Sequence, residues 1–149
     1  MCHIKYSVLQ EKSNAILEYC LKYSNSFSLI SNLKRPYSQI PPVCAHNETI
    51  SSWTDYLINY VIGIKEWPGT ITRDNHRVMY MYNSRKFRTS VYCLPNFFSA
   101  FEDNLPEDIC FYRDGKPWLF TVSHEKLAGL WDPTPRDIAF FDKVGAIIR

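Results

Sequence analysis

Apolar residues first recur at helical spacing near the start of the chain. The spacing predicts a helix that begins at Ser13, a residue type that caps helices, and runs to about Tyr23. Four apolar residues would share one face of this helix: Ile16, Leu17, Cys20 and Leu21. Residues 24–34 fit neither a helical nor a strand period, and three prolines within 35–47 predict an irregular loop.

A second stretch of apolar residues also recurs at helical intervals and predicts a second helix. Thr49 or Ser51 would cap this helix, and the triplet Trp67-Pro68-Gly69 would end it. The apolar positions that define it are Trp53, Leu57, Tyr60, Val61 and Ile64.

Strand-forming residues dominate the middle of the chain. Arg77–Tyr82 is rich in them and predicts a strand that would place Met79 and Met81 on one face. Residues 87–94 fit a strand or a short helix. Pro95 at a first helical turn, followed by Phe97, Phe98 and Phe101, predicts a short aromatic helix.

The last third contains the clearest local signals. Two strand-like runs, 109–112 and 118–122, flank Asp114-Gly115, and Asp-Gly is the pair that a two-residue type I′ hairpin turn prefers. Pro117 opens the second run and cannot donate a backbone hydrogen bond, which predicts a sheet edge there. Thr134, followed by Pro135 at the first helical position, predicts a final helix through about Lys143.

These elements predict one domain, 1–149, of the α+β class. Helices would come first, an antiparallel sheet with a C-terminal β-hairpin would follow, and a helix would close the fold. The five cysteines are widely spaced and form no CxxC pair, so the cysteine pattern indicates neither a zinc ribbon nor a redox motif. The sequence shows no signal peptide and no long apolar run, which predicts a cytoplasmic protein that does not enter a membrane.

Charge is nearly balanced, at +2, which argues against non-specific nucleic-acid binding through a basic surface. The charges are unevenly distributed along the chain. Residues 73–88 carry five basic residues and one acid, and with Tyr80 and Tyr82 between them they leave a nucleic-acid or regulatory binding module as one alternative. An acidic run contains Glu102, Asp103, Glu107 and Asp108.

Candidate chemistry is sparse. His124 beside Glu125 is a pair that could act in general acid–base catalysis, and a small nuclease-like enzyme using these two residues is therefore a second alternative. The chain has no HExxH motif, EF-hand loop or spaced Cys/His quartet, and its five glycines form no phosphate-binding loop. We therefore expect neither a metal nor a cofactor.

From Pro106 onward the chain resembles a group of small bacterial cytosolic proteins that is similar to the immunity proteins encoded beside secreted or contact-delivered toxins. The resemblance covers about the last 85 residues. The matching segments are Pro106-Glu107-Asp108, Phe111-Tyr112-Arg113-Asp114-Gly115-Lys116-Pro117-Trp118, Ser123-His124-Glu125 and, earlier, Trp67-Pro68-Gly69.

The resemblance implies a protein of contact-dependent growth inhibition systems that neutralises a cognate toxin and needs no catalytic group. Many intracellular toxins are basic nucleases, so the carboxylates of the acidic run are the expected contacts with the partner, because complementary charge speeds selective association. Those carboxylates belong to Glu102, Asp103, Glu107 and Asp108. Phe97, Phe98 or Trp118 would supply the apolar anchors.

Overall fold

The computed structural model describes residues 1–31, 55–83, 98 and 107–148. The predicted proline loop, the ambiguous segment 87–94 and most of the short aromatic helix lie outside these residues. The described elements, in chain order, are β1 (Cys2–Lys5), α1 (Tyr6–Glu11), α2 (Ser13–Lys22), β2 (Ser26–Ser31), β3 (Leu57–Trp67), β4 (Thr70–Tyr82), β5 (Glu107–Arg113), β6 (Lys116–Val122), the 3₁₀ turn η4 (Ser123–Glu125), β7 (Leu127–Leu130) and α5 (Pro135–Lys143).

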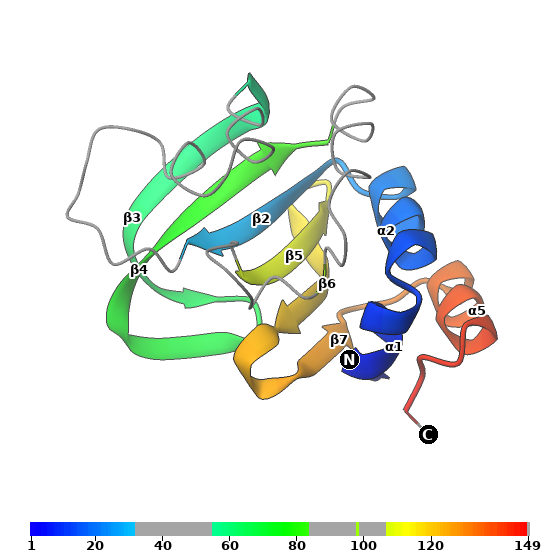
Figure 1. The fold of residues 1–149 in the computed structure, drawn as a ribbon. Coiled ribbons are helices and arrows are strands. Elements are labelled where there is room, and N and C mark those ends of the chain that lie inside the picture. Colours follow the sequence, from blue (N-terminus) through cyan, green and yellow to red (C-terminus); the bar gives the residue numbers. More distant parts are fainter. Residues whose placement is uncertain (32–54, 84–97, 99–106, 149) are drawn as a thin grey trace.

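The fold is α+β, as expected, and the sheet dominates it. The strands form one antiparallel sheet in the order β1-β7-β6-β5-β2-β4-β3. The helices α1, α2 and α5 gather at one side of this sheet (Figure 1). The expected order of helices first and sheet second is wrong in detail, because β1 precedes the first helix.

The main core lies between the sheet and the helices. Alternate residues of the central strands point into it, among them Phe27, Met79 and Phe111, and all three are fully buried. Leu17 and Phe141 reach it from α2 and α5. The strand prediction for Arg77–Tyr82 is confirmed within the longer β4, and Met79 and Met81 share the core face as expected.

The second predicted helix is wrong, because Leu57–Trp67 forms the strand β3. The register between β3 and β4 shifts three times, which breaks the period of two that a regular strand would show. The positions of β3 that are at least partly buried are therefore Leu57, Tyr60, Val61, Ile64 and Trp67. This spacing imitates a helix, although the β-branched residues of the segment favour a strand.

Trp67-Pro68-Gly69 ends β3 as a hairpin turn and not as a helix stop. Trp67 pairs with Thr70, and Gly69 has a φ of 89°, so Pro68 and Gly69 occupy the central positions that a type II turn assigns to them. Proline and glycine end helices and make tight turns for the same backbone reasons, so the triplet alone could not distinguish the two.

The helix predicted from Ser13 is confirmed as α2, but Ser13 does not cap it. The cap position is Lys12, whose N–H donates to the carbonyl of Val8 in α1, and the Ser13 hydroxyl is buried without a hydrogen-bond partner in the described residues. The strand β1 and the helix α1 were not predicted. His3 lies within β1.

The predicted C-terminal hairpin is confirmed. Asp114 and Gly115 have φ angles of 49° and 77°, the positive values that a type I′ turn requires at both positions. The edge predicted at Pro117 is wrong, because β6 lies between β5 and β7. Pro117 is tolerated there because the ladder with β7 begins only at Leu119, and because its partner Tyr112 adjoins a bulge.

The final helix is confirmed as α5, with its predicted cap. The Thr134 hydroxyl accepts the N–H of Asp137, and the Asp137 carboxylate accepts the N–H of Thr134, which is a complete capping box. Pro135 occupies the first turn. The N-terminal and C-terminal ends of the chain lie on the same side of the fold (Figure 1).

The sheet is curled. The far half of the β3–β4 hairpin bends round towards β6 and β7 (Figure 1). A Cβ atom on Gly69, at the hairpin tip, would lie 2.6 Å from the ring of Phe120 in β6, so only glycine allows this close approach. The curl thereby brings residues from about position 70 against residues from about position 120.

Candidate functional site

Of the carboxylates predicted to contact a partner, the structure describes Glu107 and Asp108. Glu102 and Asp103 lie outside the described residues. Asp108 is only 2% exposed, and it accepts hydrogen bonds from the indole N–H of Trp67 at 2.9 Å and from the backbone N–H of Ser123 at 2.7 Å. Asp108 therefore joins the hairpin to the start of η4, and its contact with a partner stays a prediction.

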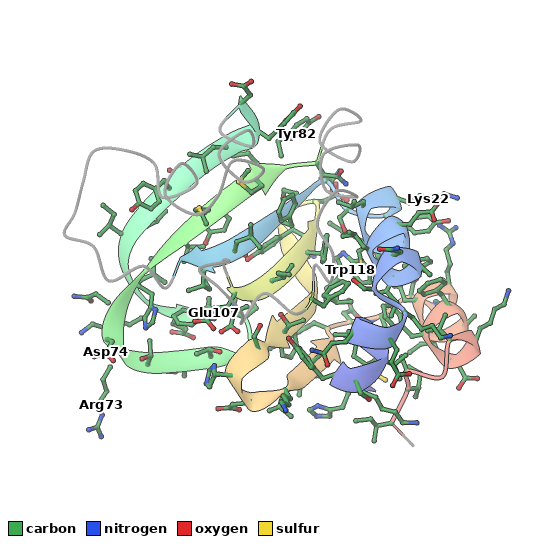
Figure 2. The ribbon with its side chains drawn as sticks, in the orientation of Figure 1. Lys22, Arg73, Asp74, Tyr82, Glu107 and Trp118 are labelled. Atoms are coloured by element: carbon green, nitrogen blue, oxygen red, sulfur yellow. The ribbon has the colours of Figure 1, made fainter. Side chains whose placement is uncertain are left out.

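Glu107 remains partly exposed. One carboxylate oxygen of Glu107 is buried and has no hydrogen-bond partner in the described residues. Burial raises the pKa of Glu107, the neighbouring Asp108 raises this pKa further, and His124 opposes them. Figure 2 shows Glu107 within the fold, whereas Arg73 and Asp74 project from the outer bend of the hairpin.

Neither described apolar anchor lies on the surface. Phe98 is 1% exposed and Trp118 is 3% exposed. The indole N–H of Trp118 donates to the hydroxyl of Ser24 at 2.9 Å, and the guanidinium of Arg113 lies 3.7 Å from the centre of the Trp118 ring. Both side chains are buried and contribute to the core, so a role as partner anchors stays a prediction.

His124 and Glu125 lie together on η4. Their nearest nitrogen and oxygen are 3.6 Å apart, and both side chains are about half exposed. In the described part of the chain no nucleophile is hydrogen-bonded to His124. Cys110 is buried, and burial raises the pKa of its thiol to about 12, which leaves the thiol unreactive at neutral pH.

A second charged group consists of Arg113 and Asp137, which are ion-paired. Arg113 forms a two-pronged ion pair with the buried Asp137, with both nitrogen–oxygen distances at 2.7 Å, and its third nitrogen donates to the carbonyl of Tyr23. The hydroxyl of Tyr19 donates to Asp137 at 2.8 Å. This network ties α2, β5 and α5 together.

The surface around Trp131 has a different character. Trp131 follows β7 and is 51% exposed, and Ile71, on the hairpin tip, is 82% exposed. Two hollows meet at Trp131 and Pro117. The first, of about 470 Å³ and called here the hairpin hollow, is lined by Glu66, Trp67, Pro68, Gly69, Thr70, Ile71, Pro117 and Trp131.

The second hollow, of about 710 Å³, is called here the strand-end hollow. It is lined by Met1, Arg113, Asp114, Lys116, Pro117, Trp118, Trp131, Asp132 and Thr134. We refer to the residues lining both hollows as the Trp131 surface. An exposed tryptophan between two concave regions has the shape and the residue type that protein interfaces favour.

Acidic residues border the Trp131 surface. Glu66, Asp114 and Asp132 are exposed, and no ion pair involving them is formed within the described residues. Arg113 is already paired with Asp137, which leaves Lys116 as the cationic side chain without a described acidic partner. The side-chain charge available to a partner here is therefore negative.

Sequence reasoning missed the Trp131 surface because it is assembled by the curl. Glu66 and Ile71 are more than forty positions from Pro117 and Trp131 in the chain, and only the docked hairpin brings them together. One local signal was present. Trp131 follows a short apolar strand and precedes Asp132-Pro133, so it stands where the chain turns out to the surface.

Three wider observations complete the description of the site. No group of three or more His, Cys, Asp or Glu residues that could hold a metal ion occurs in the described ranges. Among the helices that the structure describes, none has the length and apolar character needed to cross a membrane. Comparisons with protein-family models, with curated proteins and with solved structures found no match to this chain.

Proposed function

We propose that this chain is an immunity protein that binds and neutralises a cognate bacterial toxin, and that the Trp131 surface is where it binds. The observation that supports the binding role is the half-exposed Trp131 between two hollows. The toxin as the partner follows from the resemblance of about the last 85 residues to immunity proteins.

Burial of Trp131 by a partner would contribute much of the binding energy. Tryptophan is the residue type most often found at interface positions whose truncation costs 2 kcal/mol or more, as an order of magnitude. Ile71 and Pro117 lie next to it and extend the apolar area. An apolar side chain of the toxin would bury this apolar area by entering the hairpin hollow.

The carboxylates favour a cationic partner such as a nuclease toxin. Glu66, Asp114 and Asp132 replace the buried Asp108 as the acidic contacts of the proposal. Nuclease surfaces that bind phosphates are positively charged, and opposite charge on the inhibitor raises the association rate. The overall charge of +2 does not oppose this, because local charge guides the final approach.

The alternative of a nuclease-like enzyme receives less support. General acid–base catalysis needs a second group near His124, and the described residues supply Glu125 at 3.6 Å and the partly buried Glu107. The nucleic-acid alternative rests on residues 73–88, of which the described, exposed basic side chain is Arg73.

The first test is protection in cells. The toxin encoded next to this chain is co-expressed with the wild type, with Trp131→Ala and with Ile138→Ala, a control on α5 where the residue is 38% exposed. We expect the wild type and the control to protect. Trp131→Ala should weaken toxin binding about 30-fold or more, as a loss of 2 kcal/mol implies, and should protect poorly.

Two outcomes would contradict the proposal. Death of cells that express the wild type with the toxin would refute immunity itself. Full protection by a Trp131→Ala protein of normal thermal stability would refute the Trp131 surface alone. In a purified complex, Asp114→Asn with Asp132→Asn should slow association at low salt and have little effect at high salt.

A further inference from the structure

The far half of the β3–β4 hairpin extends beyond the rest of the sheet. β2 pairs with β4 only over residues 77–82, so in the described residues the part of β4 before Arg77 pairs with β3 alone. A two-stranded hairpin is marginally stable by itself in water. Among the described residues, the contacts made by the hairpin tip are therefore what holds residues 63–76 against β5 and β6.

A backbone irregularity marks the point where this segment begins. Gly63 has a φ of 79°, and the register between the strands shifts on both sides of Ile64. A Cβ atom on Gly63 would meet nothing within 4 Å, so packing does not require glycine here. The backbone conformation does require it, and such positions absorb large changes of direction in a strand.

The tip is fixed by a hydrogen bond and by packing, and Trp67 also lies in a buried cluster with Ile30 of β2. The indole of Trp67 donates to Asp108, which Ser123 holds from the other side. Gly69 lies against the ring of Phe120 and the side chain of Val122. These contacts join the segment to β5 and β6 through side chains, without strand pairing among the described residues.

We propose that residues 63–76 form a hinged flap, which bends at Gly63 and is latched by the Trp67–Asp108 hydrogen bond. The docked tip supplies Trp67, Gly69 and Ile71 to the hairpin hollow, whose other wall is formed by Pro117 and Trp131. Release of the latch removes the first wall, so the hollow exists in the closed state and is lost in the open one. This property belongs to the free protein and does not depend on the toxin proposal.

Hydrogen exchange of the free protein tests the flap. Trp67→Phe keeps an aromatic side chain, though a smaller one, and removes the donor of the latch. It should raise amide exchange in residues 63–76 about tenfold, as expected for loss of one buried hydrogen bond, while β5 and β6 change little. The matched control is Trp118→Phe, which removes the indole bond to Ser24 and should not affect the flap selectively.

A second variant tests the hinge without disturbing the core. Gly63→Ala adds a methyl group in open space and changes only the backbone preference, so it should also raise exchange in 63–76 selectively. The proposal is overturned if Trp67→Phe raises exchange uniformly over the chain, because the hairpin would then open only with global unfolding. It is equally overturned if neither variant alters exchange in the flap.

Discussion

Asp137 illustrates how a carboxylate is accommodated inside this fold. Burial alone would raise its pKa, but hydrogen bonds from Arg113, Thr134 and Tyr19 together lower the pKa to about 2. Each of these partners comes from a different element or cap. The carboxylate thus serves at once as the helix cap of α5 and as the counter-ion of a β5 arginine.

We predict that Asp137→Asn lowers the free energy of unfolding by about 3 kcal/mol at pH 7, because it leaves the Arg113 charge without its partner. The folded-state pKa of Asp137 lies below its unfolded value of 3.8. The ionised group therefore stabilises the fold above about pH 4, and this contribution is lost as the pH falls towards 2. Denaturant titrations between pH 2 and pH 7 measure both effects.

The control for this prediction is Asp132→Asn, since the Asp132 side chain is exposed. The wild type and the control should lose stability together between pH 4 and pH 2, whereas Asp137→Asn should lose much less over that interval. If the free energy of unfolding fell in parallel with pH for all three proteins, ionised Asp137 would not stabilise the fold.

Glu107 presents the opposite case, because the fold raises its pKa. A raised folded-state pKa favours the protonated form, so the group stabilises the fold below its unfolded pKa, and this contribution is lost as the pH rises through the folded pKa. We predict that Glu107→Gln raises Tm by about 2 °C at pH 7. The gain should shrink at pH 4, and thermal melts at the two pH values measure it.

Glu125→Gln is the matched control, since its side chain is 56% exposed, and it should leave Tm unchanged at both pH values. A lower Tm for Glu107→Gln at pH 7 would mean that the ionised carboxylate makes a stabilising contact. The unpaired oxygen of Glu107 in the described residues argues against such a contact.

At the scale of elements, the sequence predicted those whose ends are set by local chemistry. Thr134 and Asp137 cap α5 through contacts within four residues, and the backbone preferences of Asp114-Gly115 favour its turn. Distant residues add to both, since Arg113 donates to Asp137 and the N–H of Asp114 donates to Asn25, but the local signal is already in the sequence. Both could therefore be predicted without knowledge of tertiary structure.

β3 was not predictable from its pattern, because its bulges are set by the strand it pairs with. Each register shift against β4 moves the next buried residue by one position, and the result imitates helical spacing. The same limit applies to the site. Trp131 could be identified in the sequence, but the curl of the sheet brings Ile71 to the same hollow.

At the scale of the whole molecule, residues 146–148 cover the edge of the sheet that β1 forms. The N–H of Lys5 donates to the carbonyl of Ala146 at 2.8 Å, and the N–H of Ile148 donates to the carbonyl of His3 at 3.2 Å. Ile4 also pairs with Ile147 as an isolated bridge. The C-terminal segment thus satisfies β1, whose free edge could otherwise pair with another chain.

The curl, in contrast, depends on the ring of Phe120. This ring lies directly over Gly129 of β7, its neighbour in the sheet, and over Gly69 of the hairpin tip. A Cβ atom at Gly129 would lie 2.7 Å from the ring, closer than real Cβ contacts occur. The two glycines therefore fit the same ring from two sides, and the position of the ring sets how closely the hairpin docks.

We predict that Gly129→Ala lowers the free energy of unfolding by about 2 kcal/mol, because the added methyl group must displace the Phe120 ring. Phe120→Leu removes the ring and should recover about 1 kcal/mol of that loss in the double variant. Gly115→Ala is the control, since a Cβ atom there meets nothing within 4 Å. The changes in the free energy of unfolding caused by Gly115→Ala and Phe120→Leu should add in their double variant, as measured by denaturant titrations. Additive effects for Gly129→Ala as well would mean that the Phe120 ring does not set how closely the hairpin docks.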